Sequence, residues 1–502
     1  MQRWTGRGLG YLLGLSAVAW SGLAAAAPTA DPAPLEAVSQ HRGVFGGVAI
    51  NYEAAVEETR IAGAGGAPGA SIVSFSYLKS GQVEPGRPVL FVFNGGPGSA
   101  SIWQHLGVFG PRRLAIPDGV MPTATPPFRL EDNPNAPLDV ADVVLIDPPG
   151  TGFSHLLAGA KPSDFYGVQS DAQATVDFIE AWLTRHGRWN SPKFLVGESY
   201  GTIRAAVAAK LALGGPTTPA GRISGLSFNG VVLIGQAMDN TGDAERGYAE
   251  MLPSFAATAW YHKRAGVGRS LNETIAAAQA FASGDYRQAL WAGDRLSPEA
   301  RQAVAARLAA LTGLPQGLIL DHDLRISAPV FRNALLHDRD LSVGAYDSRY
   351  TLSSRGAGGD PVADDPAMGQ YVPAFVAALH TYLHDELRLT IDRPYEAIAF
   401  HTVNGAWDYG DGPGRPSQVN YALDLAAAMR RNPRMKLMIG AGDYDLVTPL
   451  GSADYVAAHS DLPQDRVVIH SYEAGHMVYM GEQNAKALAT DLRAFITLAD
   501  QP

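Results

Sequence analysis

The sequence predicts an α/β fold in which a mostly parallel central sheet has helices on both faces and receives a largely helical cap insertion. Three observations support this prediction. Short apolar runs alternate with helical patterns, which is typical of parallel strands buried on both faces. The segment LVGESYGT (195–202) joins one such run to a helix-prone stretch through a Gly-x-Ser-x-Gly pattern. Between residues 238 and 387 the strand rhythm fades.

Composition limits the class of protein. The chain has 502 residues, of which 46% are hydrophobic and 18% are charged, so it can bury a large core. Its formal net charge of −10 argues against nucleic-acid binding, which usually requires a basic patch. It has no cysteine, which excludes disulfides, thiol catalysis and Cys-ligated metals.

The N-terminus has the pattern of a secretory signal. Arg3 and Arg7 precede an apolar run at 9–23, and small residues follow at 24–27. We expect residues 1–27 to be a signal peptide; a single membrane anchor is the alternative. No later segment resembles a membrane span. The prediction is an exported protein, periplasmic or secreted, from a bacterium.

The order of the elements follows from the apolar runs. Residues 28–45 are rich in Pro and Ala and are expected to form a loose lead-in. Helices are expected at 202–213, which is rich in Ala, and from the cap residue Ser297 to Gly313. Buried strands are expected at 88–93, 142–147 and 193–196, and later strands at 230–235, 435–440 and 466–470. The core would then comprise 28–237 and 388–502, with the helical cap at 238–387.

Ser199 is the candidate nucleophile. A strand before it, a helix after it and a glycine on each side allow a sharp turn that exposes the hydroxyl at the sheet edge. The structural alternative is a tight turn without chemistry. A serine needs a base, and the base needs an orienting acid, in the chain order Ser, Asp, His. His476 follows a late strand, and the preceding strand leads to two candidate acids, Asp443 and Asp445.

An acyl-transfer site also needs two preorganised N–H donors for the oxyanion. The N–H of Tyr200, directly after the serine, is one candidate. Gly96, in the loop Asn94-Gly-Gly-Pro-Gly, can provide the other, because glycine lets the backbone approach a substrate closely. The alternative for this loop is a simple connection between a strand and a helix.

No metal and no cofactor are expected. The chain lacks His-Glu-x-x-His, and the polar clusters at 321–323 and 337–338 lie in the predicted helical insertion, where solvated side chains are the commoner explanation. The Gly-rich run at 63–70 lacks the strand-to-helix setting that phosphate binding requires.

Five short segments contain the candidate residues and their neighbours. They are FNGGPGSAS (93–101), LIDPPGTGFSH (145–155), LVGESYGT (195–202), AGDYDLVTP (441–449) and EAGHMVYM (473–480). Together they resemble the serine carboxypeptidases of the α/β-hydrolase fold. Proline iminopeptidase-like proteins also use GGPG and GESYG. Asn94 and the run DPPGTGFS favour the carboxypeptidases, because the competing group typically has an Asp-x-Arg-Gly pattern there.

The resemblance implies a serine hydrolase whose substrate is a peptide with a free C-terminus. Its spacing assigns the acid to Asp445. It also implies that Asn94, Gly95 and Glu198 bind the C-terminal carboxylate. Two adjacent carboxylates cannot both stay ionised, so Glu198 would carry a proton and donate it, which predicts activity at acidic pH. The alternative for Glu198 is a helix cap that points away from the substrate.

The chain also departs from the family pattern. Val92 replaces the usual Trp, Val108 the usual Glu, and Ser99 the usual Cys. The first two changes leave the proposed triad intact but remove groups that help to hold the carboxylate in the family. A second hypothesis therefore keeps the triad in an esterase, acyltransferase or other peptidase. A third is a binding protein that has kept the fold without catalysis.

Overall fold

A computed structural model describes residues 34–82, 84–119, 125–356, 359–410, 412–413, 415 and 418–499. The expected signal peptide, residues 1–27, lies outside these residues. None of the described helices combines the length and the apolar character that crossing a membrane requires.

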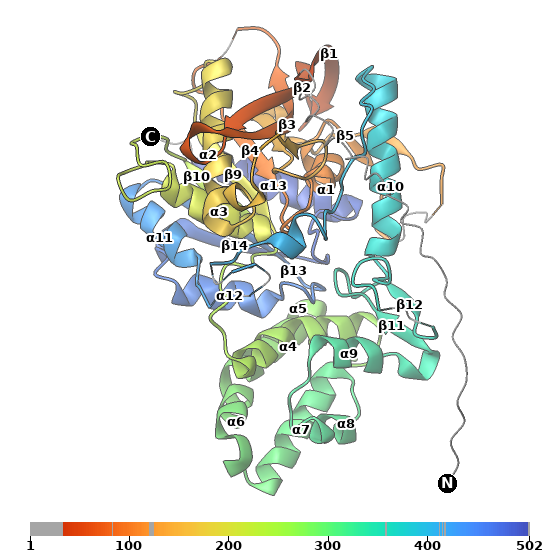
Figure 1. Cartoon of the computed structure of the whole chain (residues 1–502). Coiled ribbons are helices and arrows are strands. Elements are labelled where there is room, and N and C mark those ends of the chain that lie inside the picture. The colour runs from red at the N-terminus through yellow and green to blue at the C-terminus, as the bar shows by residue number, and fades with distance from the viewer. Residues whose placement is uncertain are drawn as a thin grey trace, which may run out of the picture.

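The central sheet is mixed but mostly parallel (Figure 1). Its strand order is β1-β2-β3-β7-β4-β9-β10-β13-β14, and a short strand, β8, pairs with β3. Pairing is antiparallel from β1 to β7 and parallel from β7 to β14. The strands of this sheet are β1 Glu36–Phe45, β2 Val48–Ala62, β3 Pro68–Lys79, β4 Val89–Phe93, β7 Asp142–Ile146, β8 His155–Leu156, β9 Lys193–Glu198, β10 Gly230–Ile234, β13 Lys436–Gly442 and β14 Val467–Tyr472.

The predicted strands are confirmed, with ends that shift by at most two residues. The last of them, β14, lies at the edge of the sheet, and most of its side chains are exposed or half-buried. The loose lead-in predicted for 28–45 is wrong over its second half. There β1 pairs with β2 along its whole length, across a turn in which Gly46 and Gly47 both have positive φ. The strand was missed because an edge strand needs no continuous apolar run: along β1 the side chains alternate between exposed and half-buried.

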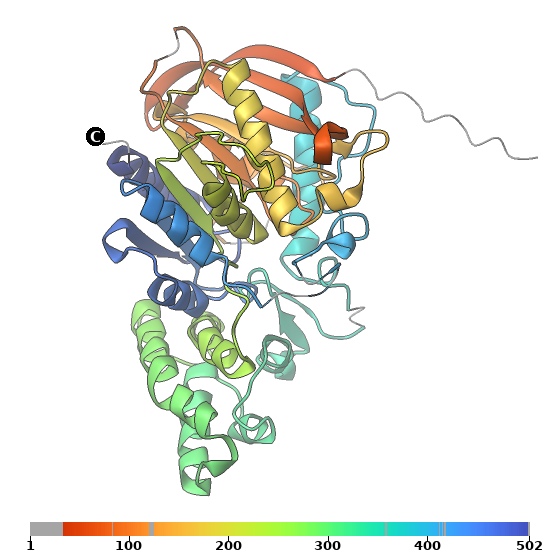
Figure 2. The same cartoon turned by 60° about the vertical axis from the view of Figure 1, so that its left-hand side comes forward.

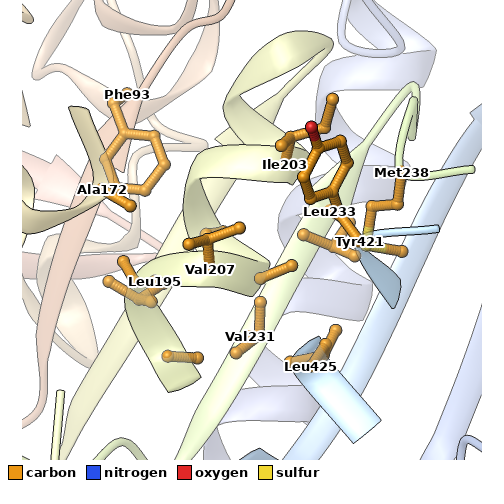
Figure 3. Close-up of a cluster of buried hydrophobic side chains, with 14 of the residues drawn as sticks. Phe93, Ala172, Leu195, Ile203, Val207, Val231, Leu233, Met238, Tyr421 and Leu425 are labelled. Atoms are coloured by element: carbon orange, nitrogen blue, oxygen red, sulfur yellow. The ribbon is translucent and has the colours of Figure 1, made fainter. Parts of the chain in front are cut away.

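Helices cover both faces of the sheet, as predicted. One face packs against α2, α3, α11 and α12, and Figure 3 shows part of this core around Leu195, Val207 and Leu233. The other face packs against α1, α10 and α13. These helices are α1 Ile102–Gln104, α2 Val168–Arg185, α3 Tyr200–Leu211, α10 Met368–Thr381, α11 Ala422–Arg431, α12 Leu450–His459 and α13 Glu482–Ala499. A two-stranded ribbon, β5 Arg112–Leu114 and β6 Leu130–Asp132, lies outside the main sheet.

A group of helices with its own hydrophobic core follows β10 and lies beyond one end of the sheet (Figures 1 and 2). It consists of α4 Ala244–Tyr261, α5 Leu271–Phe281, α6 Arg287–Ala292, α7 Pro298–Thr312, α8 Gln316–Asp321 and α9 Ala328–Ala334, followed by the small hairpin β11 Leu341–Val343 and β12 Thr351–Ser353. The predicted helix from Ser297 to Gly313 is α7: the Ser297 side chain caps its start, and Gly313 ends it with a left-handed φ of 70°. By contrast, α10 packs with the core of the sheet.

Candidate active site

Ser199 lies at a sharp turn between β9 and α3. Its backbone has φ 58° and ψ −128°, a conformation that L-residues with a side chain rarely adopt. The glycines on either side permit this turn, because a Cβ at Gly197 would lie 2.2 Å from the carbonyl oxygen of Gly201. Gly201 in turn lies against the backbone of Phe93 and Asn94. The G-x-S-x-G pattern therefore presents the hydroxyl at the carboxyl ends of the parallel strands.

The loop after β4 packs against this turn. A Cβ on Gly95 would lie 2.4 Å from the Tyr200 nitrogen, so only glycine allows the two backbones to approach so closely. Gly96 has a φ of 101°, which also favours glycine. Among the residues that the structure describes, the N–H groups of Gly96 and Tyr200 have no hydrogen-bond acceptor. Both predicted oxyanion donors are thus free beside the candidate nucleophile.

His476 and Asp445 form a buried pair on the loops after β14 and β13. The distance from His476 Nδ1 to Asp445 Oδ2 is 2.8 Å. Asp445 also accepts hydrogen bonds from the N–H groups of Val447 and Thr448 and from the Thr448 hydroxyl, which fixes its orientation. Burial alone would lower the pKa of His476, but the charge and hydrogen bond of Asp445, with a contribution from Glu198, raise it.

Asp443, the other candidate acid, lies in a different environment. Burial raises its pKa to about 7, and Glu473 adds to the effect while Ser471 opposes it. Its backbone N–H donates to the carbonyl of Tyr472, which links the loops after β13 and β14. Of the two acids that the sequence leaves open, Asp445 is the one paired with His476.

The segment between β11 and β12, residues 345–348, contacts the loops that carry His476 and Asp445. The Tyr346 carbonyl accepts a hydrogen bond from the His476 N–H at 2.6 Å, and the two rings meet edge to face. The Ala345 carbonyl accepts the N–H of Leu446 at 3.0 Å. These residues therefore help to hold the imidazole and the acid loop in place.

Glu198 and Asn94 form a buried polar pair next to Ser199. The Asn94 side-chain amide donates to Glu198 Oε1 at 2.7 Å. Burial raises the pKa of Glu198 to about 7, and Asp445 adds to this, whereas His476 and Tyr479 oppose it. A carboxyl group with this pKa can carry a proton under mildly acidic conditions and act as a hydrogen-bond donor.

A buried ion pair contacts the backbone of Asn94, next to the Asn94–Glu198 pair. Arg204 on α3 binds Asp171 on α2 at 2.8 Å, and both side chains are about 1% exposed. The guanidinium also donates to the backbone carbonyl of Asn94 and lies over the rings of Phe93 and Tyr200. One cation thus connects the first turn of α3 to the loop that carries Asn94.

A single pocket contains most of these groups. Its lining includes the glycines Gly95 and Gly96 and the polar residues Asn94, Ser99, Glu198, Ser199, Tyr346 and His476. Its apolar lining consists of Trp103, Met368, Ile398, Phe400, Val447 and Met477. Such a site combines a candidate nucleophile, a candidate base and polar groups in an apolar cleft, an arrangement that is compatible with acyl transfer.

Val92 and Val108 contribute nothing polar to this pocket. Val92 is fully buried, Val108 is 1% exposed, and both pack in the core on the α1, α10 and α13 face of the sheet. Three polar neighbours of the site were not predicted from the sequence: Tyr346, Arg204 and Tyr479. A helical arginine carries no motif signal. Tyr479 lies three residues after His476, in the segment 473–480, but the family resemblance implies no role for it.

Comparisons with known proteins agree with the sequence resemblance. A family model described as serine carboxypeptidase matches residues 73–283, which include the loop of Asn94 and the turn of Ser199. The serine carboxypeptidase-like 8 protein of Arabidopsis thaliana is 28% identical over 145 residues. That match covers 28% of this chain and 31% of the relative, so it spans about a third of the length of that protein.

Among solved structures, a prohormone-processing carboxypeptidase of Saccharomyces cerevisiae, Kex1, matches with a TM-score of 0.54 at 15% identity, over 88% of this chain and 91% of that one. At this identity the similarity concerns the fold, and it confirms the predicted α/β-hydrolase architecture. A proline iminopeptidase of Mycobacterium smegmatis reaches a TM-score of 0.35 at 15% identity, over 88% of this chain and 98% of that one. Over residues 73–283, the chain is thus similar to the serine carboxypeptidase family.

Proposed function

We propose that this protein is an exported serine carboxypeptidase, which hydrolyses the last peptide bond of peptides and works best at mildly acidic pH. The observation that carries the proposal is the buried Asn94–Glu198 pair beside Ser199 in one pocket. A carboxyl group next to a nucleophile would hinder an ordinary hydrolase. It is useful where the substrate carries a carboxylate close to the scissile bond.

The reaction would begin with attack of the Ser199 hydroxyl oxygen on the scissile carbonyl carbon. His476 takes the hydroxyl proton, and Asp445 holds the imidazole and stabilises its charge. The N–H groups of Gly96 and Tyr200 bind the oxyanion. His476 then donates its proton to the leaving amine, the released C-terminal amino acid departs, and an acyl-enzyme remains on Ser199. Water, activated by His476, hydrolyses this ester and restores the serine.

The C-terminal carboxylate of the substrate would be bound next to this centre. The Asn94 amide and the protonated Glu198 each donate a hydrogen bond to it, and Gly95 leaves room for it near the backbone. Below a pH of about 7, the pKa to which burial raises Glu198, most of the free enzyme carries the required proton. Above that pH, the ionised Glu198 repels the substrate carboxylate. Binding of free acids therefore weakens as the pH rises.

An esterase or acyltransferase that uses the same triad is the second candidate. The buried valines at 92 and 108 favour it, because neither offers a hydrogen bond to a carboxylate. In that case Glu198 would not contact the substrate, and free acids would have no advantage over neutral substrates.

One experiment separates these functions. Blocked dipeptides with an apolar C-terminal residue would be compared with their C-terminal amides from pH 4 to pH 8, with a simple acyl ester alongside and Ser199→Ala as the blank. Release of the terminal amino acid from the free acid, dependent on Ser199 and strongest at acidic pH, supports the carboxypeptidase. Equal turnover of acid and amide, or turnover of the ester alone, contradicts it and favours the second candidate.

A further inference from the structure

Tyr479 is a buried phenol with no assigned role. It lies between His476 and the start of α13 and is 1% exposed. Its ring packs against Gly107, where a Cβ would come within 2.3 Å of the ring. Gly107 precedes Val108 in the turn of π-helix at His105–Phe109. The ring thus occupies space that a larger residue at 107 would fill, beside the position where the chain has valine in place of the family glutamate.

The Tyr479 hydroxyl and Glu198 Oε2 are buried polar atoms, and neither has a hydrogen-bond partner among the described residues. A buried polar atom without a partner is unfavourable and needs an explanation. These two are complementary, because a phenol donates a hydrogen bond and a carboxylate oxygen accepts one. Glu198 Oε1 is already occupied by the Asn94 amide. The remaining oxygen is the one that lacks a donor.

The electrostatic coupling indicates that the two groups are neighbours. Burial, together with the Glu198 charge, raises the pKa of Tyr479 well above its usual value, so this phenol stays protonated and remains a donor. In return, Tyr479 lowers the pKa of Glu198, against the effect of burial. The other groups that face Glu198 are Asn94, His476 and Asp445. Of these four neighbours, only Tyr479 and Asn94 offer neutral hydrogen-bond donors.

We propose that Tyr479 is a positioning residue that donates a hydrogen bond to Glu198 Oε2 and sets the pH at which the site accepts a C-terminal carboxylate. The proposal rests on the proposed function. Tyr479 supplies, from the loop of His476, a polar partner for Glu198 that Val108 does not supply from the loop of Asn94. With donors on both oxygens, Glu198 is held in one orientation. The hydrogen bond also stabilises the ionised form of Glu198. Glu198 therefore loses the proton that substrate binding needs at a lower pH than it would if burial acted alone.

The direct test is a titration of Glu198 without any substrate. Infrared difference spectra would follow its carboxyl band, identified as the band that Glu198→Gln removes. In Tyr479→Phe we expect the Glu198 pKa to rise by about one pH unit, because the ionised form loses a donor. Tyr286→Phe is the matched control: Tyr286 is also a buried phenol, but it donates to the Leu324 carbonyl inside the cap. An unchanged Glu198 pKa in Tyr479→Phe overturns the proposal.

Kinetics provide the second readout. In Tyr479→Phe, the pH at which KM for a blocked free-acid dipeptide begins to rise should move upward by about the same pH unit. A simple ester, which has no carboxylate, is measured alongside so that any change at His476 is separated from the change in free-acid binding. A free-acid KM profile that coincides with that of the unmodified enzyme overturns the proposal. If the unmodified enzyme releases no amino acid from free acids, the proposed function fails instead, and the infrared titration still decides the role of Tyr479.

Discussion

Replacing Glu198 by Gln should remove the pH dependence of free-acid binding while leaving the binding itself. With a pKa of about 7, Glu198 is about 99% protonated at pH 5, half protonated at pH 7 and about one-tenth protonated at pH 8. If only the protonated form binds the substrate carboxylate, KM for a free acid rises about tenfold from pH 5 to pH 8. A glutamine amide donates a hydrogen bond at every pH in this range. The free-acid KM of Glu198→Gln should therefore be nearly flat.

The assay measures KM and kcat for one blocked dipeptide and its C-terminal amide, at intervals between pH 5 and pH 8. The amide has no carboxylate to repel, so the ratio of the two KM values isolates the effect of Glu198 from any general change in the protein. A simple ester reports on the triad alone. A ratio that rises as steeply in Glu198→Gln as in the unmodified enzyme, or that does not rise in the unmodified enzyme, would contradict this role of Glu198.

Two further substitutions test the support of the site. Asp445→Asn removes a charge whose carboxylate oxygen lies 2.8 Å from His476 Nδ1. With charge centres about 4 Å apart, this corresponds to about 4 kcal/mol, so kcat on an ester should fall about a thousandfold with KM little changed; a loss below tenfold would contradict the assigned role. Asp171→Asn leaves the buried guanidinium of Arg204 without its counter-charge and should lower the free energy of unfolding by about 3 kcal/mol. Urea denaturation measures this loss, and an unchanged midpoint would contradict it.

The sheet was largely predictable because its signals are local, and the candidate catalytic residues lie in segments with equally local signals. Buried parallel strands appear as short apolar runs, and the Ser199 turn needs glycines at fixed spacing. The strand at Glu36–Phe45 was missed because an edge strand satisfies its hydrogen bonds on one side only and needs no apolar run. The position of α10 was also unpredictable. Its sequence predicts an apolar helix but does not say what that helix packs against. In the folded chain it packs against the sheet, although its residues lie within the range predicted for the cap.

The support around the site could not be predicted, because it depends on contacts between distant segments. Arg204 reaches both Asp171 and the Asn94 carbonyl from a helix whose sequence resembles any Ala-rich helix. Tyr346 comes from the end of the cap and meets His476 far along the chain. Tyr479 is close to His476 in sequence, but its relation to Glu198 depends on how the loop after β14 folds back over Gly107.

The carboxyl group beside the nucleophile also bears on the base. An ionised Glu198 contributes to the raised pKa of His476, and a protonated imidazole cannot accept the serine proton. In the proposed mechanism, protonation of Glu198 therefore has two effects. It creates the donor that binds the substrate carboxylate, and it removes a negative charge that would keep His476 protonated. Both effects favour the same protonation state, so a glutamate directly before Ser199 is compatible with catalysis under the mildly acidic conditions in which free C-termini bind.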